Sequence, residues 1–86
     1  MTSEMIQKFV ENKVRKNTVV NIHFKDRNTV TGLFIHSMDY DELKSKNFWR
    51  IVTSNHADEW KQTGDLNLAR LFNGVSFTRL SDDQNS

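Results

Sequence analysis

The chain has 86 residues, a net charge of +1, and neither cysteine nor proline. This length allows one domain, which we place at residues 1–80, and it buries only roughly 60–65% of the surface that the unfolded chain exposes. Without cysteine, neither a disulfide framework nor a thiolate metal site can support the core. Apolar runs are shorter than the ~18 residues of a membrane span, and a signal-peptide pattern is missing. We therefore expect a soluble, cytoplasmic protein without a membrane partner.

Charge is distributed unevenly along the chain. Residues 1–27 carry a balance of +3, and the remaining residues sum to −2. This asymmetry would steer a nucleic acid towards the front half of the chain. The candidate phosphate contacts there are Lys13, Arg15 and Lys16. The alternative is the ordinary solvated face of one helix.

The first half of the chain predicts a helix followed by two strands. A helix over residues 3–15 is indicated by apolar residues at three- and four-residue spacing. From Thr18 to Lys25 the apolar period changes to two, and a turn at residues 26–28 leads into a second strand at residues 29–37, so we expect an antiparallel hairpin. Gly32 inside the second strand predicts a sharp bend or bulge.

A buried strand over residues 47–53 is the element around which we expect the chain to be organised. It follows a polar connection at residues 39–46, and it contains Phe, Trp, Ile and Val within five positions. This composition is typical of a strand buried on both faces, so it predicts the central strand of a small sheet.

The last third of the chain predicts a short helix and two further strands. Residues 57–62 have the pattern of the helix, and Gly64 would close it as a C-terminal cap. The strands are expected at residues 67–72 and 75–80, joined by Asn73-Gly74, which is a strong hairpin signal. Residues 81–86 have nothing to bury and are expected to form a disordered tail.

This order of elements resembles the Sm and Sm-like (Hfq-like) family, and two local patterns add to the resemblance. Gly32, Phe34 and Asp39 stand at the offsets of the first family motif. The second motif has an apolar residue, Arg-Gly, two further residues and another apolar one, and the segment 72–77 has this shape with Asn73 in the arginine position. The resemblance covers roughly residues 3–80.

The resemblance implies a fold that is mainly β, with one N-terminal α-helix and a small, strongly bent five-stranded antiparallel barrel. Open edges of such a sheet would be protected by self-association into a homo-oligomer. The family also implies a non-catalytic module that binds single-stranded RNA. The family holds RNA through an asparagine after the motif aspartate and through the motif arginine, but Asp41, Glu42 and Asn73 stand at those places here. A protein-interaction or scaffold oligomer without RNA binding is therefore the alternative.

The chain also resembles a group of small uncharacterised bacterial proteins, in residues 39–52 and 67–74. Some of these carry the label short-chain dehydrogenase. A dinucleotide site needs a glycine-rich turn between a strand and a helix, whereas the three glycines here stand far apart at positions 32, 64 and 74. We expect no enzyme activity, no cofactor and no metal site.

Aromatic residues next to cations are the remaining candidates for binding. Trp49 and Arg50 could stack and hold nucleobases, together with Asn73 in the second motif. The alternatives are that Trp49 packs against the N-terminal helix and that Arg50 pairs with a carboxylate such as Asp39. Trp60 and Tyr40 are the candidate interface residues.

Overall fold

The computed structural model describes residues 1–16 and 18–82, with the side chains of residues 12–16 left aside. Three α-helices lie in this part of the chain: α1 (Ser3–Lys16), α2 (Tyr40–Ser45) and α3 (Ala57–Thr63). The five strands are β1 (Val20–Phe24), β2 (Val30–Phe34), β3 (Phe48–Thr53), β4 (Arg70–Asn73) and β5 (Phe77–Asp82). Short 3₁₀ turns lie at Ser54–His56, Leu66–Leu68 and Gly74–Ser76. The molecule is a small mixed α/β fold rather than one mainly of strands.

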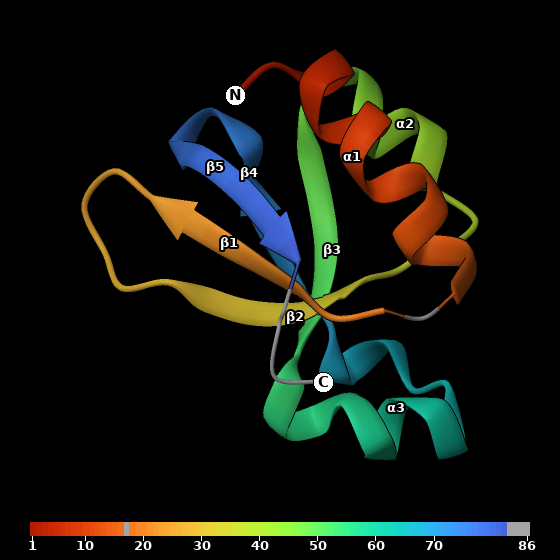
Figure 1. Cartoon of the computed structure of the whole chain (residues 1–86). Helices are drawn as coiled ribbons and strands as arrows, with labels where there is room; N and C mark the ends of the chain where they lie inside the picture. Colours follow the sequence, from red (N-terminus) through yellow and green to blue (C-terminus); the bar gives the residue numbers. More distant parts are fainter. Residues whose placement is uncertain (17, 83–86) are drawn as a thin grey trace.

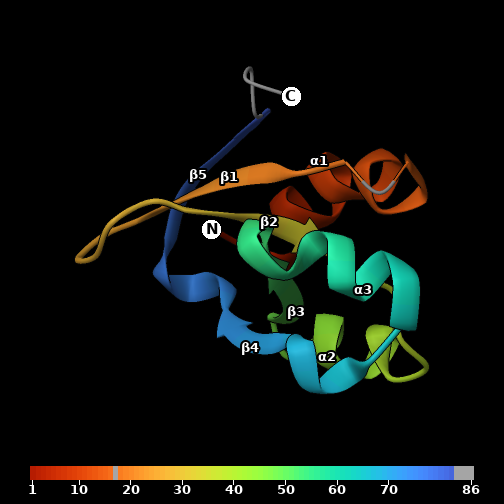
Figure 2. The same cartoon turned by 90° about the horizontal axis from the view of Figure 1, so that it is seen from below.

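The strands form one antiparallel sheet in the order β4-β3-β2-β1-β5 (Figures 1 and 2). The predicted hairpin of the first two strands is confirmed, with Val20 facing Gly32. β2 lies in the middle of the sheet, so the expectation that residues 47–53 form the central strand is wrong by one place. β3 nevertheless has a neighbour on each side.

The predicted hairpin at Asn73-Gly74 is wrong. β4 pairs with β3 and β5 pairs with β1, at opposite edges of the sheet. The Asn73 side chain accepts a hydrogen bond from the Val75 amide (3.0 Å) and starts the 3₁₀ turn that carries the chain between the edges. Local turn chemistry was read as a hairpin, but it connects two strands that do not meet.

The sheet is curved but not closed into a barrel, because β4 and β5 do not pair with each other in the part that is described. The curvature brings rings from distant strands together: Phe72 of β4 lies 5.9 Å from Phe24 of β1, and Phe24 lies 5.2 Å from Phe77 of β5. Phe34 of β2 continues this series of rings to Trp49 of β3. The concave face of the sheet is therefore an aromatic core.

Helix α1, which lies beside α2 in Figure 1, packs against this core. Ile6 and Val10 are fully buried in it, whereas Met5, also part of the predicted apolar stripe, is 54% exposed. The Ser3 hydroxyl donates to the Lys44 carbonyl of α2 (2.6 Å). This bond fixes α1 against the connection between β2 and β3.

A second apolar cluster lies on the other face of the sheet. Leu33, Ile35 and Val52 are buried there, and Trp60 of α3 packs against them. The predicted α3 and its cap are confirmed: Gly64 has φ 65° and its amide donates to the Trp60 carbonyl (2.7 Å). Helix α2, by contrast, was expected to be an irregular polar connection.

The C-terminal boundary also differs from the prediction. Ser81 and Asp82, expected in the disordered tail, belong to β5 and face Asn21 and Val20 of β1. The pairing with β1 orders these polar residues, although they bury little side chain. Residues 83–86 of the predicted tail lie outside the described residues. No described helix has the length and apolarity needed to cross a membrane.

Gly32 gives the first testable prediction, because a Cβ there would lie 2.6 Å from the Val52 carbonyl oxygen and 2.9 Å from Ile51 Cγ2. Changing Gly32→Ala forces β2 and β3 apart, so we expect a loss of about 1–3 kcal/mol in the free energy of unfolding, measured by urea denaturation. The control is Gly64→Asn, since a side chain at Gly64 meets no atom within 4 Å and asparagine tolerates a positive φ. Equal effects of the two changes would contradict the close approach.

Candidate functional site

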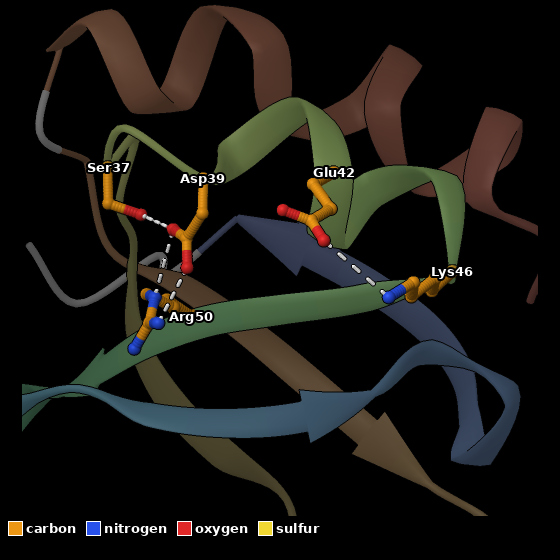
Figure 3. Close-up of polar contacts among 5 residues, drawn as sticks. All are labelled: Ser37, Asp39, Glu42, Lys46 and Arg50. Atoms are coloured by element: carbon orange, nitrogen blue, oxygen red, sulfur yellow. Dashed lines mark hydrogen bonds and ion pairs between the residues drawn. The ribbon is translucent and has the colours of Figure 1, made fainter.

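The connection between β2 and β3 contains the first group of candidate residues (Figure 3). Asp39, which precedes α2, accepts two hydrogen bonds from Arg50 of β3, at 2.7 Å from Nη2 and 3.3 Å from Nε. The Ser37 hydroxyl donates to the same carboxylate. The pairing of Arg50 with a carboxylate, one of the two sequence-based interpretations, is thus confirmed.

Electrostatics in this group favour the ionised pair. The hydrogen bond from Arg50, followed by the one from Ser37, lowers the pKa of Asp39 from its ordinary value of 3.8 to about 2. The same hydrogen bond raises the pKa of Arg50. Because both donors on one edge of the guanidinium already face Asp39, the pair fixes the start of α2 to the sheet. Arg50 therefore has a structural task, whether or not it also contacts a ligand.

Tyr40 is the first residue of α2, and its side chain packs against the core. Its ring is half-buried, 6.0 Å from the Trp49 ring and 4.2 Å from the His36 ring, and Lys44 Nζ lies 5.5 Å from its centroid. Burial, together with the charges of Glu11 and Asp41, raises the pKa of the Tyr40 phenol. Its role as an interface residue stays a prediction.

Two carboxylates on α2 occupy the region where the family resemblance places an RNA-binding asparagine. Asp41 and Glu42 have 86% and 71% exposed side chains, and they pair loosely with Lys44 (3.4 Å) and Lys46 (3.7 Å; Figure 3). These are solvated surface pairs. Because each carboxylate offsets the charge of a lysine, α2 offers a phosphate no net positive charge through these four residues.

Trp49 belongs to the core and presents no ring face to a nucleobase. It is 2% exposed, and its indole nitrogen donates to Asn47 Oδ1 (2.8 Å). Asn47 has φ 62°, and its carbonyl accepts from the Gly74 amide (2.8 Å). A Cβ on Gly74 would meet the Asn47 side chain and Ile6 Cδ1 (2.5 Å). The second family motif thus packs tightly beneath α1, with exposed Asn73 at its turn.

The remaining predicted residues do not gather around one site. Trp60 is half-buried on the second apolar cluster, so at most part of its ring is available to a partner. The side chains of Lys13, Arg15 and Lys16 lie outside the described residues. The structure therefore brings Asp39, Tyr40, Trp49 and Arg50 together, and mainly through contacts with one another.

A group that the sequence analysis missed lies at the β1–β2 turn and on β4, the edge strand that pairs with β3. The Arg27 guanidinium lies 5.1 Å from the Phe24 ring centroid and 5.8 Å from that of Phe72, and the Arg70 guanidinium lies 5.9 Å from Phe72. We call these four residues the arginine–phenylalanine cluster. Arg27 and Arg70 are separated by half of the sequence, so only knowledge of the strand register could have brought them together.

Neither guanidinium group of this cluster pairs with a carboxylate among the described residues. Arg27 and Arg70 are exposed, and within residues 1–16 and 18–82 neither has an ion pair. Asp26, the neighbour of Arg27 in sequence, is exposed too. The cluster therefore combines two uncompensated cations with aromatic rings.

Histidines and carboxylates do not form a metal site within the described part of the chain, where no group of three or more such residues could hold an ion. His23 instead bonds Ser81 (3.1 Å), Thr29 (3.2 Å) and Arg79 (3.3 Å) on the outer face of β1. Comparison with protein-family models, curated proteins and solved structures found no match for the chain. The site must therefore be argued from its own chemistry.

Asp39 gives a prediction for pH dependence. Its pKa is lower in the folded state, so the ionised carboxylate contributes stability that is complete above pH 3.8 and is lost as the pH falls towards 2. We expect the difference in unfolding free energy between the wild type and Asp39→Asn to be largest near pH 5. It should shrink over this acid range in chemical denaturation. The control Asp41→Asn, at an exposed carboxylate, should show a much smaller difference. A wild-type advantage that is independent of pH would contradict the role of the charge.

Proposed function

We propose that this chain is a non-catalytic Sm-like binding module that self-associates and binds single-stranded RNA. The observation that supports the Sm-like assignment best is where the motif residues lie. Gly32 permits close contact of β2 with β3, Asp39 ties α2 to Arg50, and Gly74 packs on Asn47. An N-terminal helix above a curved five-stranded antiparallel sheet agrees with the same proposal.

Self-association is supported by the two open edges of the sheet. β4 and β5 each leave one side without a neighbouring strand in the described structure. Leu71 of β4 is 51% exposed, and Val75 in the turn between the edges is 57% exposed. Pairing of edges between subunits would satisfy backbone groups and cover these side chains. It would also enlarge a core that is small for a single chain.

Single-stranded RNA is supported as the ligand by the arginine–phenylalanine cluster, because cations beside aromatic groups suit a flexible polyanion with stacking bases. The alternative is a protein-interaction or scaffold oligomer that does not bind RNA. Asp41, Glu42 and Asn73 favour this alternative, since two of them are anionic and the third uses its side-chain oxygen in a turn.

Self-association predicts an oligomer that depends on the β4 edge. In size-exclusion chromatography with light scattering, the wild type should elute as a defined oligomer. Leu71→Glu should shift it towards smaller species, because a charge on an edge strand opposes pairing. Met5→Glu is the matched control, at 54% exposure on α1 against 51% for Leu71. A monomer across a wide concentration range would contradict the oligomer.

RNA binding predicts a steep dependence on salt. A labelled single-stranded oligoribonucleotide should bind the wild type at low salt and lose affinity sharply as the salt rises, because bound phosphates release counterions. Fluorescence anisotropy measures this, with absorbance of the purified protein at 260 and 280 nm as a check for bound nucleic acid. A clean oligomer without affinity for RNA at low salt would support the scaffold alternative instead.

A further inference from the structure

We propose that single-stranded RNA contacts this chain at the arginine–phenylalanine cluster, where Arg27 and Arg70 bind its phosphates. The inference rests on the proposed function and specifies its site. It places the ligand at the β1–β2 turn and on the part of β4 that precedes Asn73, whereas the family resemblance implies contacts at Asn73 itself and on α2. Three observations on these four residues lead to it.

The first observation is that two like charges lie over the same ring, that of Phe72. Both guanidinium carbons lie within 6 Å of the Phe72 centroid, so they can be no farther apart than the two distances combined, 5.8 and 5.9 Å. Their mutual repulsion is not offset by a carboxylate among the described residues. An anion that enters this region gains from both charges at once. Phosphate groups of a strand supply such anions in series.

The second observation is that each guanidinium group lies over a ring, with its central carbon 5.1 to 5.9 Å from the ring centroid. A cation at this distance is attracted to the ring, and the guanidinium keeps five N–H donors. These donors match the oxygens of a phosphate, which arginine binds at two points. The attraction to the rings restricts Arg27 and Arg70 before the ligand arrives. Less side-chain entropy is then lost on binding.

The third observation is the shape of the aromatic base. Phe72 is only 7% exposed and Phe24 is half-buried, so the two rings anchor the arginines to the core rather than moving with them. Arg27 and Arg70 are themselves exposed, and nucleobases stack on arginine in single-stranded RNA complexes. The guanidinium groups of Arg27 and Arg70 can thus provide both positive charge and a surface for base stacking. That combination favours a nucleic acid strand over an acidic peptide, which needs the charge alone.

A purely structural role for the same residues makes a different prediction. Arginine stems can cover apolar surface while their charged ends stay in water. If Arg27 and Arg70 only shield Phe24 and Phe72, their replacement lowers stability and leaves RNA affinity unchanged. Binding and stability must therefore be measured on the same variants.

The test uses the full chain with the double variant Arg27→Gln/Arg70→Gln and the control Lys8→Gln/Arg79→Gln. Both remove two exposed cations, and the control residues lie on α1 and on the His23 side of β5. The probe is a fluorescein-labelled oligouridylate of about ten nucleotides, within the usual range of site sizes. Thermal melting and light scattering verify the fold and the oligomeric state of each variant.

We expect the Arg27/Arg70 variant to lose at least ~10-fold in affinity at low salt, with a salt slope that is smaller by about 1.4 because two phosphate contacts are gone. The control should keep the wild-type affinity. Arg27→Lys/Arg70→Lys should keep most of the salt slope but bind more weakly, since lysine has the charge without the planar donors.

Several results would overturn the proposal, and they separate it from the proposed function. If Arg27→Gln/Arg70→Gln binds RNA with the wild-type affinity, the RNA site lies elsewhere on the chain. The proposed function as an RNA-binding module then stands. Loss of binding only in Lys13→Ala/Arg15→Ala/Lys16→Ala would place the contact on α1. If the double variant and its control lose RNA affinity equally, binding depends on the overall charge of the protein and not on this cluster. If polyglutamate displaces the labelled probe as strongly as unlabelled RNA does, the cluster binds carboxylates and is not specific for nucleic acid. No wild-type binding at all overturns both proposals.

Discussion

The close approach of β2 to β3 at Gly32 is the constraint on which the rest of the fold depends. The backbone of β3 lies where any larger residue would place its Cβ. The sheet is curved, and the curvature brings the ring of Phe72 of β4 within 5.9 Å of that of Phe24 of β1 although two strands lie between them. The aromatic core and the arginine–phenylalanine cluster above it both exist because of that curvature.

Polar residues that attract attention in the sequence are largely occupied by structural contacts. Arg50 is bound to Asp39, the Trp49 indole to Asn47, and the Asn73 side chain to the Val75 amide. Such pairs hold α2 and the β4–β5 connection in place beneath α1. Among the described residues, Arg27 and Arg70 take part in no such pair, and they lie over the rings of Phe24 and Phe72. The same aromatic core therefore supports both the scaffold and the candidate binding residues.

Sequence reasoning succeeded where the signal is local. The helix at Ser3–Lys16, the first hairpin, the strand at Phe48–Thr53 and the Gly64 cap each follow from spacing or turn chemistry within a few residues. It failed where register decides: Asn73-Gly74 connects opposite edges, and Ser81 and Asp82 extend β5 through their pairing with β1. Arg27 and Arg70 were missed for the same reason. Their proximity is a property of the curved sheet and of no segment alone.

The pairing of β1 with β5 has a consequence for how the molecule is made. Val20 faces Asp82 and Ile22 faces Leu80. The inner strand β1 can therefore complete its pairing only after β5, near the end of the described chain, has been synthesised. Pairing between such distant segments slows folding, since a long loop must close before any contact compensates for it. Until then β1 is itself an exposed edge. The growing chain thus passes through a stage in which it is prone to aggregate, and only release of its C-terminal strand ends that stage.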